Sequence, residues 1–67
     1  MVIIPSSVIY GREIAHVLRQ EGFEASSNER LNGPVVSVRC AGDAEVEVIE
    51  LVRRVDPGAR PQRSPAP

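Results

Sequence analysis

The chain has 67 residues, of which 42% are hydrophobic and 3% aromatic, and its formal net charge is −1 at pH 7. A domain of this length has a core that barely offsets the entropy of ordering its backbone, so we expect self-association to add stability. The low net charge disfavours general binding of nucleic acid or of an anionic membrane, because both select a strongly basic face.

The first two elements are a short strand and a helix. Val2–Ile4 is a run of β-branched residues that Pro5 ends, which is typical of a strand buried on both faces. Ser6 or Ser7 provides an N-cap for the helix that follows, and Gly22 provides the residue with positive φ that ends it. The apolar positions at helical spacing are Val8, Gly11, Ile14, Ala15, Val17 and Leu18.

Two further strands are predicted in the middle of the chain. Residues 23–27 alternate, with Phe23 and Ala25 facing inward, and residues 28–33 form a polar connection that ends in the turn dipeptide Asn32-Gly33. Pro34 begins the third strand. In that strand Val36, Val38 and Cys40 are expected to face inward, and Val35, Ser37 and Arg39 outward.

Gly42-Asp43 is expected to turn the chain and cap a second helix. Its apolar stripe is formed by Val48, Leu51, Val52 and Val55, extended by Ala44 and bordered by Val46 and Ile49. Asp56-Pro57-Gly58 ends this helix. We therefore expect one folded domain over residues 1–57 and a flexible Pro-rich tail over residues 58–67.

The order β-α-β-β-α predicts an α+β, two-layer sandwich of the ferredoxin-like (split βαβ) plan, with both helices on one face of the sheet. We expect the first strand to pair in parallel with the third. The fourth strand of the plan is predicted to be missing or vestigial, because Pro61 would interrupt the pairing of residues 59–63. The edge of Val2–Ile4 would then be open, and an open edge is a template for another chain.

Two segments carry a resemblance to a known family. "LRQEGFEAS" (Leu18 to Ser26) and "LVRRVDPGA" (Leu51 to Ala59) resemble the small cytosolic ferredoxin-like domain, of unsettled function, at the C-terminus of certain bacterial multi-pass membrane proteins. In that family an Asp-Pro after the last helix leads to an aromatic residue and a fourth strand, whereas Arg60-Pro61 stand there in this chain. Through its expected fold alone, the chain also resembles small regulatory ligand-sensing modules of the ACT and PII-like types.

The first candidate site is an anion site at the start of the first helix. Ser6 and Ser7 would offer hydroxyls and free backbone N–H groups, with Arg12 one turn later and Arg39 nearby at a dimer junction. The alternative is plain helix capping by the two serines. Cys40 and a single histidine, His16, provide no tetrahedral zinc set, so we expect no metal and no cofactor.

The second candidate site is the uncovered face of the sheet. A sandwich this small covers only one side of its sheet, and the other side would be apolar with a polar rim, as interfaces are. The residues predicted for this interface are Val2, Ile4, Tyr10, Val35, Ser37 and Arg39. RNA recognition through such a face needs aromatic residues on the strands. The strand residues expected there, Glu24, Ser26, Val35, Ser37 and Arg39, include none.

These patterns together predict a non-enzymatic regulatory or adaptor module. It would act through self-association, as a homodimer, or through a protein partner, at the open sheet face and the edge of the first strand. The alternative is a sensor of a small anionic ligand at the N-terminus of the first helix. No signal peptide and no apolar run of about 18 residues is visible, so we expect a cytoplasmic protein that binds neither membrane nor nucleic acid.

Overall fold

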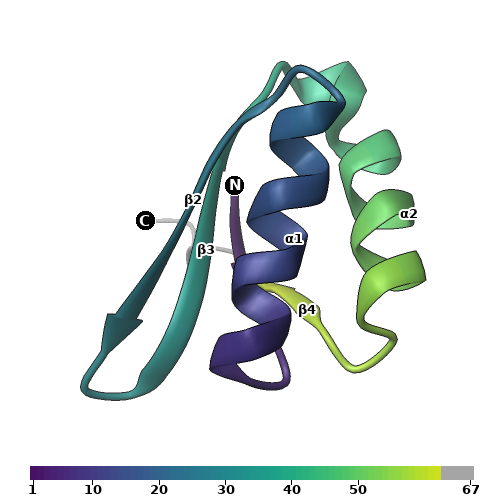
Figure 1. Ribbon diagram of the computed structural model, residues 1–67. Coiled ribbons are helices and arrows are strands. Elements are labelled where there is room, and N and C mark those ends of the chain that lie inside the picture. Colours follow the sequence, from purple (N-terminus) through teal and green to yellow (C-terminus); the bar gives the residue numbers. More distant parts are fainter. Residues whose placement is uncertain (63–67) are drawn as a thin grey trace.

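The structure, a computed structural model, describes residues 1–62 and shows one four-stranded antiparallel sheet with two helices packed on one of its faces (Figure 1). The protein is therefore α+β, in the order β-α-β-β-α-β. The elements are β1 (Val2–Ile4), α1 (Val8–Gln20), β2 (Glu24–Arg30), β3 (Gly33–Arg39), a 3₁₀ turn (Gly42–Ala44), α2 (Glu45–Val55) and β4 (Arg60–Gln62).

Helix α1 begins and ends where the sequence predicts. The Ser7 hydroxyl accepts from the Tyr10 N–H at 3.3 Å and caps the first turn, and Gly22 follows the helix with φ of 94°. Gly11 lies where α1 comes nearest to the start of the chain, and a Cβ there would lie 3.2 Å from Cγ of Pro5. A side chain at position 11 would therefore fit only if Pro5 or α1 moved by a few tenths of an ångström.

The β2–β3 hairpin is longer than predicted. β2 continues to Arg30, which pairs with Gly33, so the turn is Leu31-Asn32 and the expected polar connection over residues 28–33 is wrong. Gly33 has a φ of 113° and lets the chain re-enter the ladder directly after the turn. Residues 28–30 can be polar because β2 lies at the edge of the sheet. Water solvates their side chains, and β3 provides partners for their backbone.

The strand order is β2-β3-β1-β4, and every neighbouring pair is antiparallel. The predicted parallel pairing of the first strand with the third is therefore wrong. The connection through α1 makes β2 run in the same direction as β1, and the tight hairpin then reverses the chain. β3 enters between them and must run antiparallel to β1.

The fourth strand is present, which corrects two predictions. β4 pairs with β1 along its whole length, from Ile4 opposite Arg60 to Val2 opposite Gln62. The edge of β1 is therefore closed by the chain itself, and residues 58–62 belong to the folded domain rather than to a tail. Ala59 is buried in the core. The remainder of the predicted tail, residues 63–67, lies outside the described residues.

Pro61 fits into β4 because its ring nitrogen points away from β1. Met1 and Val38 exchange both backbone hydrogen bonds, each at 2.8 Å, so Met1 and Ile3 direct their polar groups toward β3. Val2 and Ile4 therefore direct theirs toward β4, where they face Gln62 and Arg60. Pro61, opposite Ile3, needs no N–H on that side. It instead removes the one donor that the free edge of β4 would present.

The core lies between the sheet and the two helices. The predicted inward residues of β3, Val36 and Val38, are buried, and Phe23, Ala25 and Cys40 pack against them. In α2 the predicted stripe holds, but Val46 is 66% exposed and Asp43 makes no capping hydrogen bond. The buried apolar residues are Ile3, Ile14, Ala15, Leu18, Val36, Val38, Val48, Val52 and Ala59. None of the helices within residues 1–62 has the length and apolar character needed to span a membrane.

Asp56 connects the junction between β1 and α1 to the turn between α2 and β4. Its side chain is 2% exposed and accepts three hydrogen bonds: from the Ser6 N–H at 2.7 Å, from the Ser6 hydroxyl at 2.7 Å and from the Gly58 N–H at 3.1 Å. Burial alone would raise the pKa of Asp56, but the hydrogen bonds from Ser6 and Gly58 outweigh it and hold this pKa below its ordinary value. The carboxylate thus fixes the β1–α1 junction to the start of β4.

Replacing Asp56 with asparagine should destabilise the protein by about 2 kcal/mol at pH 7, since an amide cannot accept all three hydrogen bonds equally well. In a domain of this size that loss lowers the melting temperature by about 10 °C. Asp43→Asn, the same change at an exposed carboxylate, is the control and should leave it unchanged. Equal melting temperatures for the Asp56 and Asp43 variants would contradict the role of Asp56.

The stability contributed by Asp56 also depends on pH. Because the pKa of Asp56 is lower in the folded protein than in the unfolded chain, folding releases protons as the carboxyl ionises. This stabilisation is complete above about pH 5 and disappears as the pH falls through the folded-state pKa. In urea unfolding at several pH values, the difference between wild type and Asp56→Asn should therefore shrink below about pH 5.

Gly58→Ala should destabilise by about 1–3 kcal/mol, because the added Cβ would collide with the Ser6 hydroxyl oxygen. Gly42→Ala is the matched control, since a Cβ at position 42 meets no atom within 4 Å. In the Ser6→Ala background the collision is gone, so Gly58→Ala should have a smaller effect there. Equal effects in the two backgrounds, measured by chemical denaturation, would contradict this contact.

A chain that ends at Ala59 should be less stable than one that ends at Gln62, by about 1–3 kcal/mol, because Val2 and Ile4 lose their backbone partners. The shorter chain also exposes an apolar edge, so it should self-associate as its concentration rises. Thermal unfolding and sedimentation equilibrium measure the two effects. If the two chains had the same free energy of unfolding and the same state of association, β4 would not complete the sheet.

Candidate functional site: the open face of the sheet

The helices leave one face of the sheet uncovered, and residues from all four strands reach it. Alternation along each strand places Val2 and Ile4 of β1 and Val35 and Ser37 of β3 on this face, opposite the core. We call it the open face. Its other members are Glu24, Ser26, Asn28, Arg30, Arg39, Arg60 and Gln62.

A groove with an apolar floor crosses the middle of the open face. Val2, Ile4 and Val35 form the floor, and its volume is about 240 Å³. Arg30 and Gln62, from strands on either side of β1 and β3, stand at its walls. The three aliphatic side chains are only partly buried, with Ile4 37% exposed, so contact with another molecule would remove further apolar surface from water.

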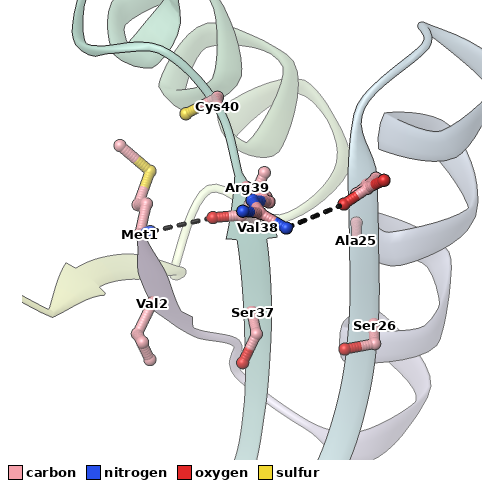
Figure 2. Close-up of a pocket in the computed structure, with 9 residues that line it drawn as sticks. Met1, Val2, Ala25, Ser26, Ser37, Val38, Arg39 and Cys40 are labelled. Atoms are coloured by element: carbon pink, nitrogen blue, oxygen red, sulfur yellow. Dashed lines mark hydrogen bonds and ion pairs between the residues drawn. The ribbon is translucent and has the colours of Figure 1, made fainter.

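A shallower hollow of about 500 Å³ lies at the other end of the open face, where β1 begins (Figure 2). Arg39 and Glu24 form an exposed ion pair there at 4.0 Å, and Val2, Ser37 and Ser26 lie in a row beside it. A pair this exposed is worth about 0–1 kcal/mol, so it leaves both side chains available for other contacts.

Two arginines of the open face were not predicted from the sequence. Arg30 was assigned to a loop because the second strand was ended at Ser27, and residues 26–30 are all polar, so no alternation of apolar and polar residues extends the strand. Arg60 was assigned to the tail because of Pro61. The direction of the Pro61 nitrogen depends on the strand register, so neither arginine has a local signal in the sequence.

The four residues predicted to hold an anion are not brought together. Ser6 gives both its N–H and its hydroxyl to Asp56, and Ser7 caps α1. Arg12 lies 3.9 Å from Glu29 on the helix side of the sheet, whereas Arg39 is on the open face beside the start of β1. The helix entrance thus already holds an anion, the carboxylate of Asp56.

Five of the six residues predicted for the interface do share the open face: Val2, Ile4, Val35, Ser37 and Arg39. Tyr10 does not, because it belongs to α1 in the other layer, where it is 41% exposed. His16 is also an exposed residue of α1, and Cys40 packs partly buried against the core at the end of β3. Within residues 1–62 no group of three or more His, Cys, Asp or Glu side chains is arranged to hold a metal ion.

Charge is distributed unevenly between the two sides of the protein. The open face carries three arginines, Arg30, Arg39 and Arg60, and one acid, Glu24. The other residues among 1–62 include eight Asp or Glu and four Arg. The open face is therefore positive on a protein whose remaining surface is negative.

No family model, no curated protein and no solved structure matches this chain. The likeness of its two segments to the small bacterial ferredoxin-like domain thus stays a prediction. Function has to be inferred from the groove and the charges of the open face.

Proposed function

We propose that the chain is a small non-enzymatic adaptor or regulatory module that binds another polypeptide through the open face. The observation that carries this proposal is the groove floored by Val2, Ile4 and Val35, which is lined as well by polar and charged side chains from β2, β3 and β4. An apolar centre within a polar rim is the composition of protein interfaces. Side chains that served only to solvate the sheet would not place three aliphatic groups together at its centre.

The open face is a better candidate for the binding surface than either edge of the sheet. β4 occupies the edge of β1, and Pro61 withholds a donor from the outer side of β4. At the opposite edge, the Arg19 guanidinium donates to the Ala25 carbonyl of β2 at 2.6 Å and occupies an acceptor that an added strand would need. A second copy of the chain therefore has no free edge to pair with at β1, because β4 already pairs there.

The ferredoxin-like plan and a cytoplasmic location are parts of the same proposal. The order β-α-β-β-α-β, the strand sequence β2-β3-β1-β4 and the two helices on one face support the split βαβ plan. No contact in the structure favours the alternative of an anion sensor, because Ser6 and Ser7 already use their polar groups within the protein.

Val35→Arg should weaken binding of a polypeptide at the open face, because it places a charged side chain on the groove floor without touching the core. Val46→Arg on α2 is the matched control, since Val46 is also an exposed valine and lies on the helical side. Peptides selected from a randomised phage-displayed library on the wild-type protein should bind Val46→Arg as strongly and Val35→Arg at least tenfold more weakly, roughly the effect of losing one central contact.

Selected peptides that bind all three proteins equally would contradict the open face as the binding surface. Sedimentation equilibrium then separates the two kinds of polypeptide partner. A wild-type dimer that Val35→Arg turns into a monomer identifies a second copy as the partner, and a wild-type monomer identifies a different chain.

A further inference from the structure

We infer that the partner of the open face is an acidic segment in extended conformation, with aliphatic side chains between its acidic ones. This inference rests on the proposed function and names the chemistry of its partner. It follows from the positions of Arg30 and Arg60 relative to the groove floor.

Arg30 and Arg60 are cationic groups without an acidic partner at salt-bridge distance within residues 1–62. They belong to the two outer strands, β2 and β4, and the groove floor lies on the two central strands between them. Neighbouring strands are about 4.8 Å apart, and Arg30 lies two residues along β2 from Asn28, which is the residue in the cross-sheet row of Val35, Ile4 and Arg60. Three strand spacings and this offset separate the backbone positions of Arg30 and Arg60 by about 16 Å. The apolar floor is thus bracketed by two positive charges.

An extended peptide advances about 3.3 Å per residue, so acids four residues apart are about 13 Å apart, and the long arginine side chains can cover the remaining distance of about 3 Å. Side chains at positions i, i+2 and i+4 of such a peptide point to the same side. Acids at i and i+4 would then meet Arg30 and Arg60, and an aliphatic residue at i+2 would lie on Val35 and its neighbours. Arginine suits this role because its planar fork pairs with a carboxylate through two hydrogen bonds.

The same charges disfavour the two other occupants of such a face. A second copy packed face to face would bring three arginines and one glutamate against an identical set, which is repulsive. A single-stranded nucleic acid would find phosphate partners but no aromatic platform, since the two aromatic residues, Tyr10 and Phe23, lie outside the open face.

Nuclear magnetic resonance titration of the full chain tests the inference with three synthetic seven-residue peptides and one RNA. The acidic peptide has the order Ser-Glu-Ser-Val-Ser-Glu-Ser, and its two companions carry glutamine or lysine in place of glutamate. A uridine octanucleotide is the fourth probe. Backbone amide shifts report both the affinity and the surface that each probe contacts.

The acidic peptide should shift the amides of Val2, Ile4, Val35 and Arg60 and bind about tenfold more tightly than the glutamine peptide, the effect expected of two exposed charge pairs. Added salt should lower the affinity for the acidic peptide until it approaches the affinity for the glutamine peptide. The lysine peptide and the RNA should leave these amides unshifted.

A pair of charge-reversal variants separates local from global charge. Arg30→Glu/Arg60→Glu should abolish the preference for the acidic peptide and create one for the lysine peptide. Arg53→Glu/Arg54→Glu changes the net charge by the same amount on the exposed side of α2 and should bind as the wild type does.

The outcomes distinguish this inference from the proposed function. If the glutamine peptide binds the open face as tightly as the acidic one, the inference is wrong and the proposed function stands. If the RNA binds there more tightly than any peptide, both are wrong. If no peptide shifts an amide of the open face even at millimolar concentration, the acidic-segment inference is wrong, and the phage selection alone decides the proposed function.

Discussion

The fold depends on one buried carboxylate. Asp56 ends α2, and its three hydrogen bonds attach the Ser6 junction, at the far end of β1, to the turn that starts β4. Without this contact the last strand would have to reach β1 through only three paired residues, one of which is a proline. The carboxylate therefore links two segments that are 50 residues apart in the chain, as a disulfide does in other small domains. Burial of this carboxyl raises its pKa, and the hydrogen bonds from Ser6 and Gly58 outweigh that effect and hold the pKa below its ordinary value.

Closing the sheet with β4 determines where another molecule can bind. The outer edges are protected by different means, a proline in β4 and the guanidinium of Arg19 over β2. Such protection is how sheet proteins avoid pairing with other chains. What remains is the face that no helix covers, which β4 widens by a fourth strand and to which it adds Arg60 and Gln62. The same three residues that complete the fold thus also complete the candidate site.

Local patterns predicted the helices and the core but not the sheet. The apolar spacing of α1, its serine cap and its terminal glycine are all encoded within one stretch of chain, and each was confirmed. Asp56 was interpreted as a helix terminator, because its partner Ser6 is 50 residues away and no local pattern links them. Pro61 was read as a strand breaker, since the direction of its nitrogen depends on the register of β1 against β3. The wrong parallel pairing has the same origin, as pairing direction follows from how connections are arranged in space. Of the candidate site, the aliphatic floor was predicted from alternation, whereas Arg30 and Arg60 depended on strand ends that local pattern places poorly.

The residues on the helix-covered face of the sheet and those on the open face contribute differently to the stability of the fold. On the helix side, buried residues fill the core, Gly11 allows close packing, and Ser6, Gly58 and Asp56 satisfy one another. On the open face, Val2, Ile4 and Val35 leave part of their apolar surface in water, and Arg30 and Arg60 stand beside no acid within residues 1–62. The apolar surface that stays in water contributes nothing to the isolated fold, and neither does a charge without a partner. Both features would lower the free energy of a complex with a molecule that is apolar in its centre and acidic at its ends. The groove and the arginines beside it thus have the pattern of a binding site, with apolar side chains at the centre and polar or charged ones around them.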